Sequence, residues 1–439
     1  MSKHSPPPKT NSGPARTTAA DVLIAVLGRN IPLESAFERV FKSARLSPRD
    51  RAFAYNLVLT SLRHLGEIEA AVASCLERPL ARQAIRARAA LVLGACQLLF
   101  LRTPAHAAVA TSVALAEMGG AARLKGLINA VLRRIAREPG SFLAGQDPAR
   151  ANTPAWLWAR WKATFGEDTC RRIAESHLAE PPLDLTVRAD PEAWARRLGG
   201  RVLPTGTVRL ADKGPITGLD GYAEGAWWVQ DAAAALPARL LGDVKGLVVF
   251  DLCAAPGGKT AQLASLGANV VALDRSPARI ARLRENLARL KLEGECIAAD
   301  ALSWTPKKNA DVVVLDAPCS GSGTIRRHPD ILHARKAEDI AELGEIQARL
   351  LAAAARLVRP GGRLLYAVCS LEPEEGPARI EGFLATGAPF RRVPAQPGCV
   401  AGCAEFLTPA GELRTLPCQW SELGGLDGFY AAVLRRNDG

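Results

Sequence analysis

The sequence of 439 residues predicts two folded parts of different class: an all-α N-terminal domain and an α/β C-terminal domain with a doubly wound parallel sheet. Apolar residues recur at helical spacing from Thr17 to Glu138. From Gly246 onwards, short apolar runs alternate with helical stretches, which is typical of parallel strands buried on both faces. Short strand-like runs and turns between the two parts predict a small connecting α+β region. The expected boundaries are a disordered tail over 1–15, the helical domain over 16–140, the connecting region over 150–235 and the α/β domain over 236–439.

The helical domain is predicted from apolar stripes and a helix-capping sequence. Ser47 followed by Pro48 predicts a capped helix start. Arg133 and Arg134 face away from the last of three stripes. These stripes consist of Val22, Leu23, Val26 and Leu27, then Leu57, Val58, Leu62 and Leu65, and then Leu127, Ile128, Val131, Leu132 and Ile135. No pattern of catalytic residues is visible in this part of the sequence.

The charge of the chain is concentrated in the helical domain. The whole chain carries 56 Lys and Arg against 44 Asp and Glu, a formal net charge of +12. Residues 16–138 contain 18 basic and 9 acidic residues, which is a surplus of 9. A surplus of this kind favours contacts with nucleic-acid phosphates. The alternative is that the arginines merely keep the helices soluble.

Neither a membrane span nor a secretory leader is expected. No apolar run reaches the roughly 18–20 residues that a bilayer requires. The opening MSKHSPPPKTNSGP lacks the apolar stretch of a signal peptide. We therefore expect a cytoplasmic protein whose ten cysteines are reduced. Those outside the motifs described below show no paired C-x₂-C spacing, so no metal site is expected.

The connecting region and the α/β domain are predicted from their apolar runs. Trp158 and Trp161 lie on one face of a helical segment, where packing is the expected use of the rings and base stacking the alternative. Helices are expected over 277–290 and 337–358. The strand candidates are LDLTVR in the connecting region, and LVVFDLC, NVVALD, ECIAAD, DVVVLDAP and RLLYAVCS in the α/β domain.

A loop rich in small residues, AAPGGKT, follows the first strand of the α/β domain and opens a helix. Its alanines and glycines let the backbone turn tightly and approach a ligand. Ligands of open α/β sheets bind at such carboxyl ends of strands. The loop matches neither G-x-G-x-x-G nor the phosphate-binding G-x-x-x-x-G-K-[ST], because Ala254 stands where the first glycine of the second motif would be.

Three carboxylates end the strands that follow this loop. Asp274 ends the second strand and suits the two hydroxyls of a ribose, whereas Asp300 suits the amine of an adenine. Asp316 ends the fourth strand. Three carboxylates at one sheet edge repel a pyrophosphate and favour a cationic nucleoside. S-adenosylmethionine therefore fits better than NAD or ATP. The alternative for each Asp is a helix N-cap.

Two cysteines also follow neighbouring strand candidates. Cys319 follows Asp316-Ala317-Pro318, and Cys369 ends RLLYAVCS. Most free cysteines are small buried apolar residues. A thiolate beside a methyl donor has another use: by adding to C6 of a cytosine it makes C5 nucleophilic enough to accept a methyl group. Cys253, within the loop, is expected to serve packing.

Five motifs give the chain a resemblance to the RNA cytosine-5 methyltransferase family: CAAPGGKT, LDRS, DAPCSGSGTIRRHPD, AVCSLEPEE and LDGFYAAVLRR. Two N-terminal stretches, RTPAHAAVATSVALAEM and LKGLINAVLRRIARE, resemble the NusB-type RNA-binding domain of the bacterial subgroup that acts on 16S ribosomal RNA. The resemblance implies a Rossmann-like methyltransferase domain that uses S-adenosylmethionine. It also implies methylation of C5 of a specific cytosine in 16S rRNA, through a covalent bond between a cysteine and C6.

The resemblance also implies a role for each motif residue. Asp274 would bind the ribose and Asp300 the adenine of the donor, and Asp316 would lie beside the methionine part and the target base. Cys369 would be the nucleophile, and Cys319 would assist release of the methylated base. The loop that binds the donor would consist of Cys253, Ala254, Ala255, Pro256, Gly257, Gly258 and Lys259. Val368 departs from the family, in which Thr commonly precedes the nucleophile.

Several alternatives stay open at this stage. DNA cytosine-5 methyltransferases use a Pro-Cys nucleophile, so Pro318-Cys319 makes the reverse assignment of the two cysteines a competitor. The same chemistry on tRNA and a non-catalytic RNA-binding protein are alternative functions. Arg326, Arg327 and His328 are candidates for contacts with the RNA backbone, or else ordinary solvated residues. The expected partner is 16S rRNA, with no DNA and no membrane, and the expected state is a monomer.

Overall fold

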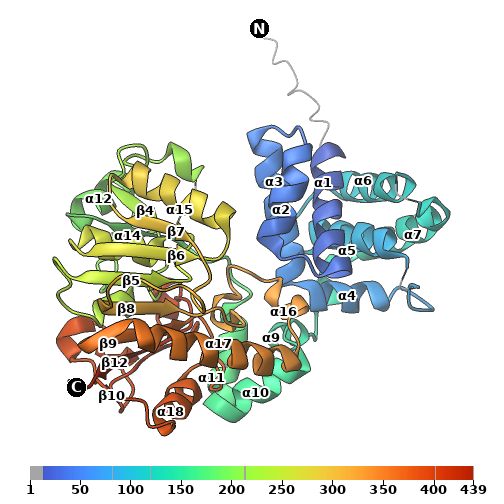
Figure 1. Ribbon diagram of the computed structural model, residues 1–439. Coiled ribbons are helices and arrows are strands. Elements are labelled where there is room, and N and C mark those ends of the chain that lie inside the picture. Colours follow the sequence, from blue (N-terminus) through green and yellow to red (C-terminus); the bar gives the residue numbers. More distant parts are fainter. Residues whose placement is uncertain (1–12, 82, 119, 212–213, 401, 439) are drawn as a thin grey trace. The chain divides into compact units, whose positions relative to one another are not determined.

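The computed structural model describes residues 13–438 except 82, 119, 212–213 and 401, and its chain divides into two compact units (Figure 1). The helical unit consists of the described residues up to Trp158 together with 328–334, and the α/β unit consists of the described residues of 159–327 and 335–438. The predicted tail lies outside the described residues, except that residues 13–15 begin the first helix. The division into four parts that the sequence suggests stays a prediction, because the contacts separate only these two units.

The helical unit is organised around a central apolar helix, α5 (Ile85–Leu99), which packs against α1, α3, α4, α6 and α7. Nearly every residue of α5 from Ala87 to Leu98 is buried, so it forms the core of the unit. The other helices are α1 (Gly13–Leu23), α2 (Leu33–Ser43), α3 (Pro48–Arg63), α4 (Leu65–Ala73), α6 (Ala105–Glu117), α7 (Lys125–Arg137), α8 (Pro139–Leu143), α9 (Pro148–Ala151) and α16 (Ile331–Ala334).

The predicted stripes of this unit lie in its core, with one exception. Val22, Leu57 and Ile128 are fully buried, as expected from their helical spacing. Leu127 is 36% exposed, so its assignment to the buried face of α7 is wrong. Leu127 precedes Ile128 at the edge of the apolar stripe. Neighbouring residues of a helix point in different directions, so a residue at the edge of the stripe can face solvent. The predicted cap is confirmed, because Ser47 Oγ accepts a hydrogen bond of 3.1 Å from Asp50 N.

The helical unit contains one segment that the sequence analysis did not assign to it. Residues 328–334 come from the middle of the α/β sequence, yet they pack within the helical unit. Asp330 Oδ2 accepts a hydrogen bond of 3.0 Å from Leu33 N, at the start of α2. His333 Nε2 lies 2.8 Å from Leu62 O of α3. The chain therefore passes from one unit to the other several times rather than once.

The α/β unit is built on a sheet of order β10-β12-β9-β8-β5-β6-β7, with β11 paired to β12. Strands β9, β8, β5, β6 and β7 are mutually parallel, which confirms the predicted parallel core. Strand β12 runs antiparallel to β9, and β10 and β11 pair antiparallel with β12, so the sheet is mixed at this edge. The bounds are β5 (Val248–Leu252), β6 (Asn269–Asp274), β7 (Glu295–Ala298), β8 (Ala310–Asp316), β9 (Val358–Val368), β10 (Phe390–Arg392), β11 (Leu413–Thr415) and β12 (Phe429–Arg436).

Helices cover both faces of this sheet. Alternate residues of each strand point to opposite faces, and the buried strands carry apolar residues on both. In β5, Val249 belongs to the core under α13 (Leu236–Arg239) and α14 (Gly258–Ser265), whereas Phe250 and Leu252 belong to the core under α17 (Ala337–Leu357) and α18 (Pro377–Ala385). Helix α15 (Pro277–Leu290) spans the predicted range of 277–290 and packs on β6 and β7. The fold is thus a three-layered, Rossmann-like α/β domain, as expected.

A small antiparallel sheet of order β2-β3-β1-β4 precedes the main sheet in the same unit. A buried ion pair fixes it, because Arg209 Nε and Nη2 donate to the two oxygens of Asp184 at 2.6 Å each. Trp158 and Trp161 are buried, which confirms packing as the use of these rings. The α-helices and strands between residues 155 and 229 are α10 (Ala155–Phe165), α11 (Glu167–Ser176), β1 (Leu183–Val187), α12 (Pro191–Leu198), β2 (Arg201–Val202), β3 (Val208–Leu210) and β4 (Trp227–Val229). In the part of the chain that is described, no helix has the length and apolar content needed to cross a bilayer.

Candidate active site

The loop between β5 and α14 lies at the carboxyl end of the central parallel strand. Ala254 N donates to Leu273 O at 2.9 Å, which ties the loop to the neighbouring strand β6. Gly257 has a φ of 105°, and a Cβ atom there would lie 3.0 Å from Leu283 Cγ, so only glycine fits. Small residues thus bring this backbone close to the sheet edge, as the sequence predicts.

Asp274 ends β6, and one of its carboxylate oxygens accepts no hydrogen bond from any described residue. Its side chain is buried, and Oδ1 accepts a hydrogen bond of 3.0 Å from Ser276 N. Oδ2 lies 3.1 Å from Arg279 Nη1 but accepts no hydrogen bond from any described residue. A buried carboxylate oxygen without a hydrogen bond is costly. This atom is therefore ready to accept a hydrogen bond from a ligand hydroxyl.

Asp300 is exposed and lies two residues beyond β7, which ends at Ala298. Its Oδ1 accepts a hydrogen bond of 2.9 Å from Leu302 N, so it caps a turn locally. The order of the strands puts the loop after β5 between Asp316 on β8 and Asp274 on β6, with Asp300 one strand further. The three carboxylates therefore follow neighbouring strands of one sheet edge.

Asp316 is held by a buried lysine. Lys259 Nζ donates to Asp316 Oδ2 at 2.7 Å and lies 5.1 Å from the ring centre of Phe429. Burial opposes the charge on Lys259, but Asp316 outweighs it and raises the pKa of the ammonium. The ion pair fixes the end of β8 against the first turn of α14. The position of Lys259 in the loop was predicted from the sequence, but its pairing with Asp316 was not.

Asp251 is a buried acid of β5 that the sequence analysis missed. Its Oδ2 accepts a hydrogen bond of 2.6 Å from Thr260 Oγ1, and its Oδ1 accepts none among the described residues. Burial, together with the negative charge of Asp316, raises the pKa of Asp251 to about 7, although Thr260 and Lys259 act in the opposite direction. An acidic residue inside an apolar strand, as in LVVFDLC, is the signal that marks it.

The two predicted cysteines lie next to each other. Cys319 follows β8 and Cys369 follows β9, and their Sγ atoms are 3.4 Å apart. Both side chains are half-buried. The hydrogen bond with Cys369, then burial, and then the charge of Cys369 raise the pKa of the Cys319 thiol well above its ordinary value. The structure therefore pairs a protonated Cys319 with Cys369.

Cys253 has a different environment. Its side chain packs against the core under α17, and burial together with Asp316 and Asp274 raises the pKa of its thiol to about 12. A thiol with this pKa carries almost no thiolate near pH 7. This environment agrees with the packing role that the sequence suggests for Cys253.

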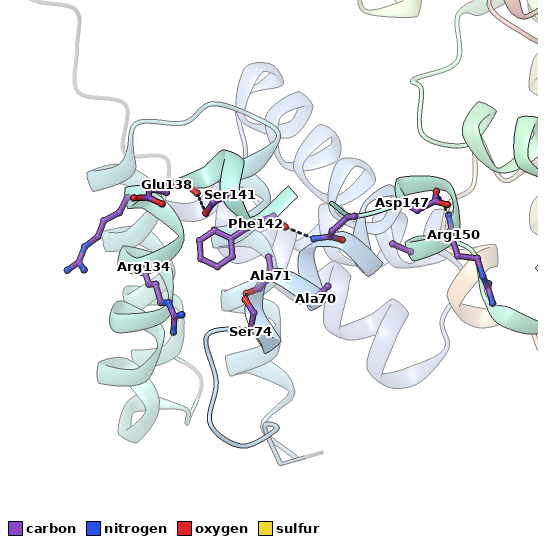
Figure 2. A pocket seen from close by; sticks show the side chains of 12 residues that line it. Ala70, Ala71, Ser74, Arg134, Glu138, Ser141, Phe142, Asp147 and Arg150 are labelled. Carbon is purple, nitrogen blue, oxygen red and sulfur yellow. Dashed lines mark hydrogen bonds between the residues drawn. The ribbon is translucent and has the colours of Figure 1, made fainter. Parts of the chain in front are cut away.

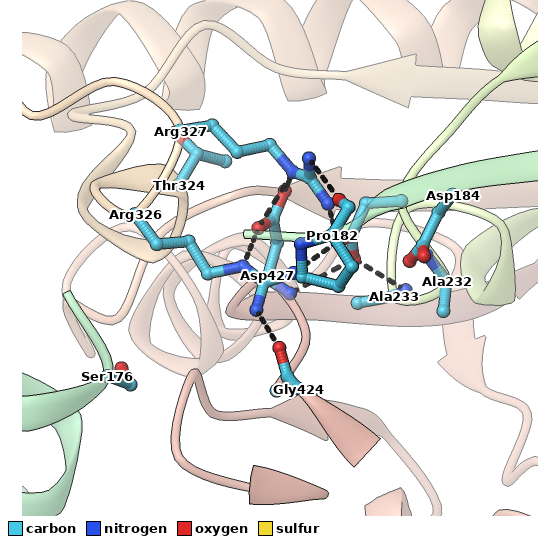
Figure 3. Close-up of polar contacts among 12 residues, drawn as sticks. Ser176, Pro182, Asp184, Ala232, Ala233, Thr324, Arg326, Arg327, Gly424 and Asp427 are labelled. Atoms are coloured by element: carbon cyan, nitrogen blue, oxygen red, sulfur yellow. Dashed lines mark hydrogen bonds and ion pairs between the residues drawn. The ribbon is translucent and has the colours of Figure 1, made fainter. Parts of the chain in front are cut away.

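Arg326 and Arg327 lie in a buried ion-pair cluster rather than on a surface (Figure 3). Arg326 donates to Asp427 Oδ1 at 2.8 Å and to Asp231 Oδ2 at 3.0 Å, and Arg327 Nη2 donates to the same Asp231 oxygen at 2.6 Å. Burial opposes the ionisation of Asp231, but the two arginines outweigh it and lower its pKa. The expectation of plain solvation is wrong for these two arginines, because both pair with Asp231 and Asp427 and their side chains are only 2% and 22% exposed. The alternative of an RNA contact stays a prediction.

The helical unit carries a groove of about 850 Å³ between α4 and the end of α7 (Figure 2). Arg134 and Arg137 line it, and their side chains make no hydrogen bond or ion pair with any described residue. Arg150 lies at the other end of the groove. Glu138 and Asp147 contribute the acidic part of the lining. The groove thus offers arginines to solvent on the side of α7 opposite its apolar stripe.

The residues at the strand ends fit a bound S-adenosylmethionine. Oδ2 of buried Asp274, which accepts no hydrogen bond from any described residue, suits a ribose hydroxyl. The small residues of the loop at Gly257 let a ligand approach the backbone. The carboxylates at this sheet edge favour a cationic donor, and the loop lacks the glycine pattern of a phosphate-binding site. The fold and the site define the class of methyltransferases that take their methyl group from S-adenosylmethionine.

Comparison with known proteins gives the family within this class. Residues 238–435 match the family model "16S rRNA methyltransferase RsmB/F", and residues 13–137 match the NusB family. The chain is 38% identical to ribosomal RNA small subunit methyltransferase B of Pseudomonas putida, over 95% of this chain and 98% of that protein. It is 35% identical to the protein of the same name from Vibrio cholerae, over 96% and 97%. The chain belongs to the RsmB/F family of 16S rRNA methyltransferases, and its N-terminal domain is NusB-like.

Solved structures show the same fold. The crystal structure of PH0851 aligns with 99% of this chain and 100% of its own, with a TM-score of 0.77 and 24% identity. A methyltransferase homologue from Pyrococcus horikoshii aligns with 66% of this chain and 96% of its own, with a TM-score of 0.53 and 27% identity. The expected fold class is therefore confirmed.

Proposed function

We propose that this rRNA methyltransferase acts on C5 of a cytosine in 16S rRNA, through a covalent adduct between Cys369 and C6 of the base. The observation that carries the proposal is the pair of thiols 3.4 Å apart at the ends of β8 and β9. A second thiol at this distance has no use in methyl transfer to a nitrogen or a hydroxyl. It does have a use where a cysteine must first be joined to the base and then removed from it.

In the first step, the thiolate of Cys369 forms a bond to C6 with its electron pair. The π electrons between C5 and C6 are displaced into the ring, and C5 becomes nucleophilic. S-adenosylmethionine, when bound, supplies the methyl group that C5 attacks and keeps the electron pair of the broken bond to sulfur. Asp316, held by Lys259, is assigned to the methionine part of the donor and to the target base.

In the second step, C5 loses its proton and the bond between Cys369 and C6 breaks. The electron pair of the C5–H bond restores the C5–C6 double bond, and the electrons of the S–C6 bond return to Cys369 as a thiolate. Cys319 is the group assigned to this step: it gives its own proton to solvent and, as a thiolate, takes the proton from C5. Its high pKa comes first from the hydrogen bond with Cys369 and includes the charge of Cys369. Both causes disappear while Cys369 is a neutral thioether, so Cys319 becomes more acidic at the stage where a base is needed.

The roles of the two cysteines are tested by replacing each one, because the reaction should then stop at a different step. Cys319→Ala should form an RNA adduct that survives denaturation and requires the donor, whereas Cys369→Ala and the double variant should form none. A denaturing gel with labelled RNA measures the adduct, and Cys296→Ala, a half-buried cysteine elsewhere in the unit, is the control. Accumulation of adduct by Cys369→Ala, with none from Cys319→Ala, would invert the assignment and make Cys319 the nucleophile.

The RNA substrate is proposed from the relatives, which are named for the small ribosomal subunit. Bisulfite sequencing of rRNA and tRNA from a deletion strain tests it, because a methylated cytosine resists conversion. One position of 16S rRNA should lose protection, and loss of protection in a tRNA instead would favour the alternative substrate. A reaction on ribosomal RNA places the enzyme in the cytoplasm, and we expect it to act as a monomer.

The helical unit is proposed to bind the RNA backbone. Arginines 134 and 137 face an open groove, and the basic surplus of the chain is concentrated in this unit. Arginine contacts to phosphate release counterions and make the affinity depend on salt. In this proposal the helical unit binds the RNA, and the α/β unit transfers the methyl group at its sheet edge.

A further inference from the structure

One buried carboxylate beside the cysteines has no role in the mechanism above. Glu375 lies in the turn between β9 and α18 and is fully buried. The motif AVCSLEPEE contains it, but the sequence alone gives it no function. Among the described residues, no lysine or arginine forms an ion pair with it. A buried carboxylate without a cation needs several hydrogen bonds to be tolerated. The residues that donate these bonds show which parts of the chain Glu375 links.

The donors of Glu375 come from the residues that follow the two cysteines. Its Oε2 accepts hydrogen bonds of 2.5 Å from both Ser320 Oγ and Ser370 Oγ. Its Oε1 accepts from Ser320 N at 2.8 Å and from Gln347 Nε2 at 2.9 Å. The same glutamine amide donates to Pro318 O at 3.0 Å, on the other side of Cys319. One carboxylate therefore clamps the chain next to Cys319 and next to Cys369.

We propose that Glu375 is a positioning residue that sets the distance between the two thiols. The loops after β8 and β9 are joined at this point by the carboxylate, and the thiols one residue away are 3.4 Å apart. This inference rests on the proposed function, in which the two cysteines act in succession on one base. A clamp suits that sequence of steps, because a displacement of about 1 Å between reacting groups costs up to about 100-fold in rate.

The geometry also predicts which substitutions preserve the clamp. In Glu375→Gln, the amide oxygen can replace Oε1, and the amide nitrogen can donate to the two serine hydroxyls, which rotate to accept. In Glu375→Ala, the links to both serines are lost. Ser370→Ala removes one link only and leaves the carboxylate in place. Glu374→Ala is the matched control, because this neighbouring carboxylate is about half exposed and pairs with Arg160.

The first measurement follows the distance between the thiols without RNA or donor. Diamide takes two electrons and two protons from the thiols of the full-length protein and leaves a disulfide. Mass spectrometry of the peptides that contain Cys319 and Cys369 then gives the rate. Glu375→Ala should slow this crosslink by about tenfold or more, Ser370→Ala should slow it less, and Glu375→Gln and Glu374→Ala should form it at the wild-type rate. The inference is overturned if Glu375→Ala or, should that variant not fold, Ser370→Ala forms the crosslink as fast as the wild type.

The second measurement is the turnover of methylation. Glu375→Ala should lower kcat while the KM for S-adenosylmethionine stays unchanged, and Glu375→Gln should restore kcat. A general loss of folding would instead alter donor binding and turnover together, and a role of the negative charge would leave Glu375→Gln as slow as Glu375→Ala; either result contradicts positioning by hydrogen bonds. The crosslink does not depend on the reaction, so failure of the proposed function at Cys369 is distinguishable from failure of the clamp.

Discussion

At the scale of single residues, Asp274 Oδ2 is the most specific mark of the donor site, because it is buried and accepts no hydrogen bond from any described residue. Asp274→Ala removes a hydrogen-bond acceptor that is charged, and such bonds contribute roughly 1.5–3 kcal/mol. We expect the dissociation constant for S-adenosylmethionine to rise by about 10- to 150-fold. Titration calorimetry measures this change. Glu295→Ala, at the opposite end of the neighbouring strand, is the control, and unchanged affinity in Asp274→Ala would contradict the ribose assignment.

Asp251 makes a second prediction at this scale, concerning pH. Its pKa is about 7 in the folded protein and near its ordinary value of 3.8 in the unfolded chain. The folded protein therefore holds a proton that the unfolded chain releases between these values. The resulting contribution to stability is complete below about pH 4 and is lost as the pH rises through about 7.

Asp251→Asn removes this titration and keeps an acceptor for Thr260. Between pH 5 and pH 8, the wild type should lose about 1–3 kcal/mol of unfolding free energy relative to the variant. Urea unfolding at several pH values measures the difference. If the two profiles run parallel, Asp251 does not carry the raised pKa.

At the scale of elements, ion pairs add to the backbone hydrogen bonds that hold the loop after β8, such as that from Gly323 N to Cys369 O at 3.0 Å. Arg326 and Arg327 connect it to the turns that contain Asp231 and Asp427. Arg326→Ala removes one of the two cations that pair with buried Asp231 and Asp427 and leaves only Arg327, which costs up to about 3–5 kcal/mol. Chemical denaturation should detect that loss, whereas Arg391→Ala, an exposed position of β10, should change stability by at most about 0.5 kcal/mol. A stable Arg326→Ala variant whose RNA binding depends less on salt would instead support a contact between Arg326 and the RNA.

At the scale of the whole molecule, the two units share the chain in a way that affects experiments. Residues 328–334 of the catalytic sequence pack within the helical unit through Asp330 and His333. Deletion of residues 1–140 would therefore also remove the surroundings of this segment. Substitutions on the groove surface are the cleaner test of RNA binding.

The double variant Arg134→Ala/Arg137→Ala should weaken RNA binding and leave donor affinity unchanged. Each lost phosphate contact lowers the slope of log affinity against log salt by about 0.7–0.9, so the slope should fall by about 1.5. Fluorescence anisotropy at several salt concentrations measures it. Lys42→Ala/Arg45→Ala, two exposed cations of the same unit, is the matched control. An equal effect of both double variants would mean that RNA binding is diffuse and not located in the groove.

Local pattern was sufficient for most elements and for the candidate site residues. The parallel strands, helix α15, the capped start of α3 and the loop before Lys259 follow from periodicity and turn chemistry, which act over a few residues. Because the carboxyl ends of parallel strands share one edge, the same reasoning placed Asp274, Asp316, Cys319 and Cys369 together. The structure brings the two thiols to 3.4 Å, within that expectation.

The tertiary structure alone decided which polar groups meet. Arg326 looked like an RNA ligand in sequence, and its carboxylate partner Asp427 lies 101 residues away. The same holds for Glu375, whose partner Ser320 is 55 residues distant, and for Asp330, whose partner Leu33 is 297 residues distant. Spacing along the chain reports which face a residue occupies, but a buried charge needs partners that only the folded packing supplies. The sequence by itself therefore determined the elements and the chemistry available at the sheet edge, and the folded packing determined which charged groups are buried, paired or left ready for a ligand.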